Sequence, residues 1–359
     1  MNKKLLIITP NLQNASSGGL MWIEKFSKYA MRSYDQTEII DVMQMPKYIR
    51  KNRLINIIYY FIMLLRKKNS FIFVDHNLHV RLSVPLLLTR LLTGNRYAVI
   101  TFHVLHILRR NPVMKKIEYC SEKLLLKNAE IIIVSSKNTY QDIMKFRINP
   151  DKIRIIYPAS SYRAAKEPER KTASKLLFIG NLEPRKGIDI LIRALYTIKN
   201  MDFSLDIVGD FLQQEQYYKY LISLVDKYDM SKKIKFLGHV NAELLQKHFD
   251  EANIFIFPSL HEGYGIVLLE AMNFGLPIIA SDIAPITEIL THGVHGFLFP
   301  PGDHEALAGY IKELLCDTVL QRKIGLNNYL TSKKFPTWET VINQTFQAVR
   351  PFLDDEDRN

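Results

Sequence analysis

Short apolar runs of strand length alternate with amphipathic stretches along most of the chain. In the first half these runs are LLIITP, FIFVDH, YAVITFH, AEIIIVSS and KIRIIYP. Strands that alternate with helices predict a parallel sheet with crossover helices, the doubly wound arrangement. From Lys175 onward the pattern resumes with KLLFIGNL, FSLDIVGD, KIKFLGHV, NIFIFPSL and LPIIASD. The hydrophobic pattern therefore predicts an α/β chain with two doubly wound, Rossmann-like domains.

Between the two sets of runs the sequence changes character. Residues 157–175, YPASSYRAAKEPERKTASK, lose apolar content and gain charge and proline, which is typical of a linker. We expect an N-terminal domain over residues 1–160, a linker over 161–174 and a C-terminal domain over 175–335. Two sheets in tandem favour a cleft between the domains, with ligands at the carboxyl ends of the strands. The last helical pattern, TWETVINQTFQAVRPFL, stands apart from the second set of runs.

Composition narrows the class of protein. A length of 359 residues suits two domains of ordinary size. The two cysteines, Cys120 and Cys316, match no metal or redox spacing, which excludes a disulfide framework and a zinc ribbon and favours a reducing, cytoplasmic setting. The apolar run after MNKK is too short for a signal peptide. The longest apolar stretch, Leu54 to Leu65, falls short of the ~20 residues that span a bilayer, so we expect no transmembrane helix.

Charge is distributed unevenly. Residues 1–158 contain 26 basic and 10 acidic residues, a net charge of +16. Residues 159–359 contain 22 basic and 26 acidic residues, a net charge of −4. The segments Lys47–Lys68 and His106–Lys116 bracket apolar residues with cations, a pattern that favours an anionic membrane surface. A helix packed on a sheet is the alternative. Nucleic acid is not an expected partner, because neither a zinc spacing nor an aromatic RNA-binding signature is present.

Two adjacent cations follow the first strand of the second domain. In GNLEPRKGIDILIRAL, Arg185 and Lys186 stand directly before Gly187 and a helix. Charge-assisted hydrogen bonds and a helix N-terminus together suit a diphosphate. A solvated turn is the structural alternative.

The stretch HEGYGIVLLEAM separates two carboxylates, Glu262 and Glu270, by a glycine turn. Gly263 and Gly265 permit close backbone approach, and the helix that starts near Ile266 offers unpaired N–H groups to an anion. A carboxylate beside a diphosphate would repel it, so each glutamate is better placed to accept hydrogen bonds from sugar hydroxyls. Ribose, diphosphate and hexose in that order make a nucleotide sugar. A glycosidase with two catalytic acids is disfavoured, because these acids flank an anion site.

Polar residues also end strands in the first half. His103 follows an apolar run and is expected to project from a strand end, with a satisfied core or surface histidine as the alternative. His106 is a close competitor on the following helix. Asp75 and His76 end another strand, where they could face an acceptor or simply cap a loop.

Together these motifs resemble the retaining glycosyltransferases of family four, whose fold is the two-domain GT-B arrangement. The similarity is strong from about Lys175 to Asp303, where the motifs include GLPIIASDIAPITEIL, HGFLFPPGD and FLGHV. It is weaker in SSGGLMWIEKF, VITFH and AEIIIVSS. Asn181 departs from the pattern, since many relatives carry an arginine there. The resemblance also implies that residues 336–359 cross back to pack on the first domain.

The resemblance implies a role for each matching residue. Arg185 and Lys186 would hold the donor diphosphate and stabilise the leaving group, Glu262 would contact the donor hexose, and Glu270 would bind the ribose. His103 would lie near the sugar and complete the catalytic set. The other donor-binding residues would be Gly18 and Gly19, in a loop of the first domain, and Gly180, His239, Val240, Tyr264, Gly265, Ile266 and Val267 in the second.

The expected enzyme is a retaining hexosyltransferase that uses a UDP- or GDP-linked sugar and needs no cofactor or catalytic metal. The acceptor would be a lipid-linked or membrane-proximal glycan of cell-surface glycan or glycolipid biosynthesis, at the cytoplasmic face of the membrane. A soluble acceptor is the alternative within the same class. A sugar-nucleotide binding protein without turnover and an epimerase of the same fold are alternatives from other classes.

Overall fold

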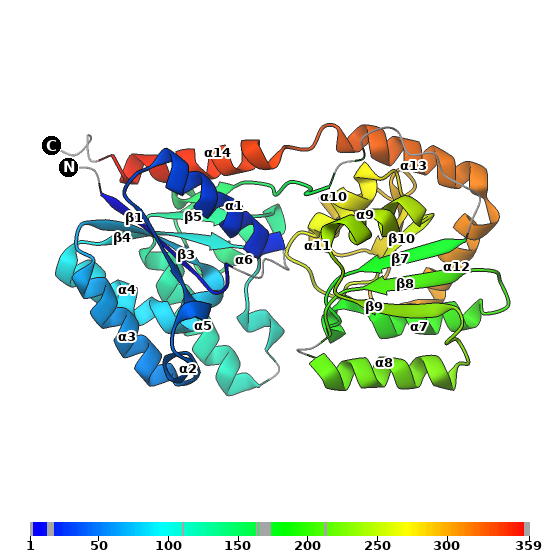
Figure 1. The fold of residues 1–359 in the computed structure, drawn as a ribbon, viewed down its shortest axis with the longest axis horizontal. Helices are drawn as coiled ribbons and strands as arrows, with labels where there is room; N and C mark the ends of the chain where they lie inside the picture. The colour runs from blue at the N-terminus through cyan, green and yellow to red at the C-terminus, as the bar shows by residue number, and fades with distance from the viewer. Residues whose placement is uncertain are drawn as a thin grey trace. The chain divides into compact units, whose positions relative to one another are not determined.

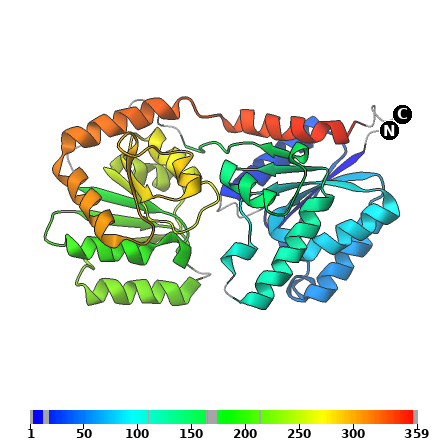
Figure 2. The ribbon, with the colours of Figure 1, turned by 180° about the vertical axis from the view of Figure 1, so that it is seen from behind.

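The computed structural model describes residues 3–12, 18–109, 111–162, 164, 174–211 and 214–354. The chain forms two compact units, each with its own core. Unit 1 contains Met1–Pro158 and Pro336–Asn359, and unit 2 contains Ala159–Phe335. Both units are shown in Figures 1 and 2.

Unit 1 is built on a six-stranded parallel sheet with the order β2-β1-β3-β4-β5-β6. Its strands are β1 (Lys4–Thr9), β2 (Thr37–Asp41), β3 (Ser70–Asp75), β4 (Arg96–Thr101), β5 (Ile131–Val134) and β6 (Ile153–Ile155). Its α-helices are α1 (Gly18–Ser33), α2 (Lys47–Lys51), α3 (Arg53–Arg66), α4 (His79–Thr93), α5 (Pro112–Asn128), α6 (Lys137–Met144) and α14 (Trp338–Val349). Short 3-10 turns are η1 (Val42–Gln44), η2 (His76–Leu78), η3 (His106–Leu108), η4 (Pro150–Lys152) and η7 (Arg350–Phe352).

Helices cover both faces of this sheet, and its central strands β3 and β4 are almost entirely buried. Every residue of β3 is buried, as expected for a parallel strand with no solvent-facing side. Helices α3, α4 and α5 lie side by side along one face, while α1 and α14 pack together along the other (Figures 1 and 2). Trp22 of α1 is fully buried, and its Nε1 donates a 3.0 Å hydrogen bond to Thr345 Oγ1 of α14. The C-terminal helix is therefore part of the core of unit 1.

Unit 2 repeats the architecture with a second parallel sheet, ordered β12-β11-β10-β7-β8-β9. Its strands are β7 (Lys175–Ile179), β8 (Ser204–Val208), β9 (Ile234–Gly238), β10 (Ile254–Phe257), β11 (Ile278–Ser281) and β12 (Gly296–Phe299). Its α-helices are α7 (Ile188–Thr197), α8 (Glu215–Lys227), α9 (Ala242–Glu251), α10 (Ile266–Asn273), α11 (Ala284–Thr287), α12 (His304–Cys316) and α13 (Thr318–Ser332). A 3-10 turn, η5 (Pro184–Lys186), precedes α7.

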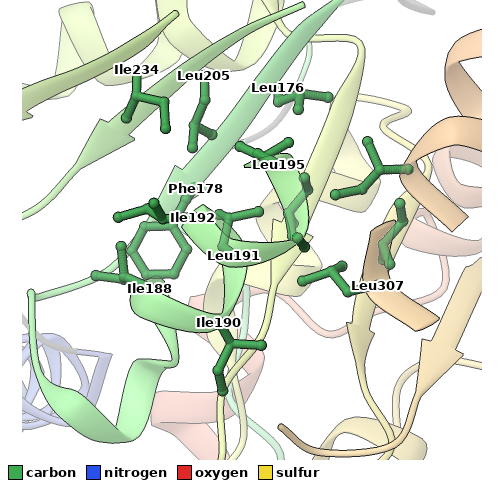
Figure 3. Close-up of a cluster of buried hydrophobic side chains, with 14 of the residues drawn as sticks. Leu176, Phe178, Ile188, Ile190, Leu191, Ile192, Leu195, Leu205, Ile234 and Leu307 are labelled. Carbon is green, nitrogen blue, oxygen red and sulfur yellow. The ribbon is translucent and has the colours of Figure 1, made fainter. Parts of the chain in front are cut away.

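Helix α7 is seated on the core of unit 2. Its buried residues Ile188, Leu191 and Leu195 face Leu176 and Phe178 of β7 (Figure 3). Because both sides of this contact are apolar and fully buried, the start of α7 and the turn before it have a fixed position on the sheet. That turn carries the two cations singled out by the sequence.

The predicted fold class, an α/β chain with two doubly wound sheets, is confirmed. Sequence patterning missed the edge strands β2 (TEIID) and β12 (GFLF). Ser160 to Tyr162 pack within unit 2, so the segment expected to be a linker starts inside that unit. Most of residues 163–173 lie outside the described residues. No helix among the described residues is both long enough and apolar enough to cross a membrane.

Candidate functional site

The turn η5 presents Arg185 and Lys186 beside the loop that follows β10. Gly187 ends this turn in the left-handed region, with φ of 66°. A Cβ atom at this position would lie 2.1 Å from the carbonyl oxygen of Pro258. Leu260 N donates a 2.7 Å hydrogen bond to the carbonyl oxygen of Arg185. Glycine is therefore required where the cation-bearing turn meets the neighbouring strand's loop.

Both cations are engaged by carboxylates of the same site. Lys186 is 8% exposed, and its Nζ donates to Glu262 Oε2. Arg185 Nε donates to Glu183 Oε2 at 2.6 Å, and its Nη1 donates to the carbonyl oxygen of His261 at 3.3 Å. Arg185 Nη1 also lies 3.8 Å from Glu262 Oε2. The site thus brings together Arg185, Lys186 and Glu262, as the sequence predicts, and adds Glu183 and the backbone of His261.

Glu262 is held in its charged form by these neighbours. Burial alone would raise the pKa of its carboxyl, but the charges of Lys186 and Arg185 and two hydrogen bonds hold that pKa at about 2. One of these bonds comes from the backbone N–H of Gly263, at 3.1 Å from Glu262 Oε1. Glu262 is therefore an anion across the physiological pH range, fixed at the end of the Lys186 side chain.

The glycine turn after Glu262 leads directly into helix α10. Gly265 has φ of 94° and is the residue before the first helical residue, Ile266. The first turn of an α-helix has N–H groups without carbonyl partners inside the helix, and here these belong to Ile266 and Val267. They carry the positive end of the helix dipole, which favours an anion. The buried ring of Tyr264 lies in the same turn.

Glu270 differs sharply from Glu262. Its side chain is 5% exposed and no cation is among the groups that shift it. Burial raises the pKa of its carboxyl to about 8, although a hydrogen bond from the backbone of Ser161 works in the opposite direction. At neutral pH the group is mostly protonated and can both donate and accept a hydrogen bond. Ser161, a partner that sequence reasoning missed, belongs to the segment expected to be a linker.

The remaining predicted donor residues of unit 2 follow neighbouring strands at one edge of the sheet. Gly180 comes directly after β7, while His239 and Val240 come directly after β9. The N–H of Gly180 bonds to the carbonyl of Val208, and the N–H of Gly209 bonds to that of Gly238, both at 2.9 Å. His239 is exposed and Val240 partly exposed. These residues therefore share the carboxyl edge of the sheet with η5 and the start of α10.

In unit 1 one expectation is corrected. Gly18 and Gly19 are not in a loop, because they are the first two residues of α1. A Cβ atom at Gly19 would lie 2.7 Å from the Phe102 ring, so close packing against that ring accounts for glycine here. Sequence patterning could not reveal this contact, since Phe102 is 83 positions away. Ser16 and Ser17, in the same motif, lie outside the described residues.

The polar residues of unit 1 gather at the carboxyl ends of β3 and β4. His103 is partly exposed in the segment after β4, and its backbone bonds to the ring of His76. His106 is held through Nδ1 by Glu122 Oε2 at 2.5 Å. Asp75 is buried, and its Oδ1 accepts from Asn77 N at 2.8 Å. Asp75 thus caps the turn after β3, one of the two roles expected from the sequence.

Residues 163–331, nearly all of unit 2, match the model of the family "Glycosyl transferases group 1". Over nearly all of its length, unit 2 is therefore similar to the group 1 glycosyl transferases. The chain is 31% identical over 176 residues to an uncharacterized glycosyltransferase of Methanocaldococcus jannaschii, covering 49% of this chain and 44% of the relative. It is 30% identical over 177 residues to the O-antigen chain mannosyltransferase B of Escherichia coli, covering 48% and 45%. The chain spans about half the length of the curated relatives it matches.

The two units share the GT-B fold with solved structures. An Anabaena protein solved in complex with UDP-glucose superposes with a TM-score of 0.77, covering 97% of this chain and 100% of that one. The sequence identity is 17%, so this similarity concerns the fold alone.

Proposed function

We propose that the chain is a retaining glycosyltransferase that moves a hexose from a nucleoside-diphosphate sugar to a lipid-linked or membrane-proximal glycan. One observation carries the proposal: in a group 1 domain, Arg185 and Lys186 lie at the carboxyl edge of the sheet with Glu262. Two cations and the N-terminus of α10 suit a diphosphate. Glu262 and Glu270 suit the hydroxyls on its two sides. The similarity to an O-antigen chain mannosyltransferase supports a cell-surface glycan as the product.

The chemistry we propose requires positioning more than covalent participation by the protein. The bond between the anomeric carbon and the diphosphate oxygen breaks, and the acceptor oxygen bonds to that carbon on the same face. The acceptor proton passes to the departing phosphate oxygen, so the anomeric configuration is retained. Negative charge grows on the diphosphate as the bond breaks, and Arg185, Lys186 and the first N–H groups of α10 stabilise it. In this proposal His103 of unit 1 contacts the sugar.

In this scheme Glu262 also positions Lys186, through the hydrogen bond between their side chains. A lysine side chain has several rotatable bonds, and an unpaired ammonium would sample many positions. Glu262 holds Lys186 Nζ in one place. Because the pKa of Glu262 is held at about 2, its carboxylate stays charged and can also accept a hydrogen bond from a hexose hydroxyl. The neutral carboxyl of Glu270 adds no repulsion toward the diphosphate. Each carboxyl thus has a charge state that fits its proposed neighbour.

The class of donor is tested by thermal unfolding with UDP, GDP, ADP and their sugar conjugates. A ligand that binds only the folded state raises the melting temperature by mass action. The UDP-glucose complex of the Anabaena protein makes UDP the first nucleotide to try. We expect one nucleotide family to raise the melting temperature well above the others. If no nucleotide changes it, the donor assignment is wrong.

A membrane-proximal acceptor is supported by the surface of unit 1. The layer formed by α3, α4 and α5 exposes large apolar side chains, namely Leu54, Ile58, Ile62, Leu88, Leu91, Leu92, Val113 and Ile117. Exposed cations on the same layer include Arg66, Lys115 and Lys116. Each cation near an anionic membrane contributes ~1 kcal/mol, and buried apolar side chains add to it. We propose that this layer docks on the cytoplasmic face of an anionic membrane.

Sedimentation with vesicles tests the docking. We expect the protein to pellet with anionic vesicles and to stay in solution with zwitterionic ones. Leu91→Glu, at a side chain that is 74% exposed on α4, should reduce pelleting at least several-fold. The matched control is Val319→Glu, at a side chain that is 77% exposed on α13 of unit 2, and it should pellet like the parent protein. If the parent protein does not pellet, a soluble acceptor is favoured. If all three proteins pellet equally, this layer is not the surface that docks.

Two alternatives from other classes are separated by product analysis. A sugar-nucleotide binding protein would stabilise on binding without releasing nucleoside diphosphate. An epimerase of the same fold would change the sugar without an acceptor. Release of nucleoside diphosphate together with a glycosylated acceptor supports the transferase.

A further inference from the structure

A buried cluster of titratable side chains lies in unit 1. His76 begins η2 directly after β3, His79 is the first residue of α4, and Glu122 belongs to α5. Their side chains are at most 2% exposed. One ring nitrogen from each histidine and one carboxylate oxygen all lie within 4.8 Å of one another. Three different elements therefore aim ligand-type atoms at a common point in the interior.

His79 has the hydrogen-bonding pattern of a metal ligand. Its Nδ1 lies 3.0 Å from the carbonyl oxygen of His76, so Nδ1 carries the proton and donates it. The other nitrogen, Nε2, is then left with a lone pair. That Nε2 is buried and has no hydrogen-bond partner in the part of the chain that the structure describes. In metal-bound histidines, the ring nitrogen that does not bind the metal typically donates a hydrogen bond of this kind, which fixes the tautomer.

His76 repeats the arrangement. Its ring bonds to the backbone of His103, while Nε2 is buried without a hydrogen-bond partner among the described residues. That Nε2 lies 3.6 Å from Glu122 Oε1. A neutral imidazole with a free lone pair is the form that binds a metal.

Glu122 supplies the negative charge of the cluster. Its Oε1 accepts from Leu105 N at 2.6 Å, and its Oε2 accepts from His106 Nδ1 at 2.5 Å. Each carboxylate oxygen has a second lone pair, so these bonds leave room for a cation. Its side chain is fully buried, and a bound cation would offset the cost of placing a carboxylate there.

We propose that His76, His79 and Glu122 form a binding site for one divalent transition-metal ion of the Zn²⁺ type. Two imidazoles and one carboxylate are a set that Zn²⁺ accepts, with a fourth position open. Ligands about 2.0–2.2 Å from a tetrahedral Zn²⁺ are roughly 3.4 Å apart. His76 Nε2 and Glu122 Oε1, 3.6 Å apart, are already close to that spacing, and the third ligand atom, within 4.8 Å of both, needs a shift of at most about 1.4 Å.

The site would fix the segment that carries His103. His76 holds the backbone of His103, and Glu122 holds the backbone of Leu105 and the ring of His106. A metal bound by His76, His79 and Glu122 would therefore tie the segment after β4 to both α4 and α5. The proposed role is positional, and the metal takes no part in the transfer chemistry. Metal binding itself does not depend on the function proposed above.

The test uses the full-length protein without a histidine tag, stripped of metal with a chelator and then titrated with Zn²⁺ alone. We expect equilibrium dialysis with elemental analysis to give one Zn²⁺ per chain, and the melting temperature to rise with Zn²⁺. His79→Asn keeps a donor for the His76 carbonyl but removes the ligand nitrogen, and Glu122→Gln keeps the shape but removes the charge. Loss of a second-shell partner weakens metal sites ~10–100-fold, so loss of either ligand should weaken binding more.

His304→Gln, at a partly exposed histidine of α12 in unit 2, is the matched control and should still bind one ion. Co²⁺ added to the unaltered protein gives a second measurement if a variant does not fold. A four-coordinate site should produce intense visible absorption that Zn²⁺ removes. The proposal is overturned if the unaltered protein takes up no Zn²⁺ and shows no such absorption. It is also overturned if folded His79→Asn or Glu122→Gln binds as tightly as the control.

Discussion

Lys186 carries the charge on which the proposed donor site most depends. Lys186 is almost fully buried, and Glu262 holds its ammonium group in place. If the side chain is truncated, a flexible surface cation cannot take the place of that charge. Removal of one preorganised group that stabilises developing charge costs about 10²–10³-fold in turnover. We expect Lys186→Ala to lose transfer activity to this extent, as measured by release of nucleoside diphosphate.

The matched control for this change is Lys232→Ala, at an exposed lysine of the same unit, which should keep normal turnover. Near-normal turnover of a variant with both Arg185→Ala and Lys186→Ala would rule out the role of this pair. Circular dichroism distinguishes lost chemistry from lost structure, because Lys186→Ala leaves Glu262 buried with one cation fewer.

Glu270 should make the stability of the protein depend on pH. Its pKa rises from 4.5 in the unfolded chain to about 8 in the folded one. Between these values the folded state holds a proton that the unfolded state has released. The free energy of unfolding therefore falls as pH rises from about 4.5 to about 8, at up to about 1.4 kcal/mol per pH unit.

Glu270→Gln removes this proton and keeps the shape of the side chain. Denaturant unfolding of both proteins at several pH values from 5 to 8 measures the difference. We expect the stability of the variant, relative to the parent, to increase as pH rises. Parallel pH profiles for the two proteins would mean that Glu270 is already ionised in the folded state.

At the scale of elements, Gly187 allows the turn η5 to pack closely against the loop between β10 and α10. Gly187→Ala would place a Cβ atom against the carbonyl oxygen of Pro258 and force alanine into a left-handed conformation. We expect a loss of at least about 2 kcal/mol in the free energy of unfolding, together with weaker nucleotide binding. Denaturant unfolding and the melting-temperature shift with nucleotide measure the two effects.

The same substitution at Gly309 provides the contrast. Gly309 lies inside α12, and a Cβ atom there meets nothing within 4 Å. Alanine is the better helix former by about 1 kcal/mol, so Gly309→Ala should stabilise the protein. If both variants are destabilised alike, the contact with Pro258 does not explain the requirement for glycine at position 187.

Most of the elements, but not all of their contacts, follow from the sequence. Runs such as FIFVD predict buried strands because every residue is apolar or ends the strand, whereas TEIID is polar at three of its five positions and GFLF begins with a glycine. The pair of Lys186 and Glu262 is separated by 76 positions, so local pattern predicts both residues but not their hydrogen bond. The burial of Glu270, and hence its protonation, depends on packing that one sequence does not reveal.

At the scale of the whole molecule, unit 1 is built from both ends of the chain. The buried hydrogen bond from Trp22 Nε1 to Thr345 Oγ1 joins α1 to α14 across 323 positions. Thr345→Val keeps the volume of the side chain but leaves the indole N–H buried without an acceptor, which costs about 1–3 kcal/mol. We expect this loss in denaturant unfolding monitored by tryptophan fluorescence.

Thr340→Val makes the same chemical change at an exposed position of α14. Its effect should stay within about 0.5 kcal/mol. Equal effects of the two substitutions would mean that the tie between α1 and α14 contributes little to the stability of unit 1.

The account depends above all on where a diphosphate binds. The most direct measurement is a crystal structure of the protein with the nucleoside diphosphate that gives the largest melting-temperature shift. We predict phosphate oxygens within hydrogen-bonding distance of Lys186 Nζ or the Arg185 guanidinium and of the first N–H groups of α10, with the ribose hydroxyls at Glu270. A diphosphate bound elsewhere in the chain, with Lys186 and Arg185 making no contact to it, would contradict the proposed function.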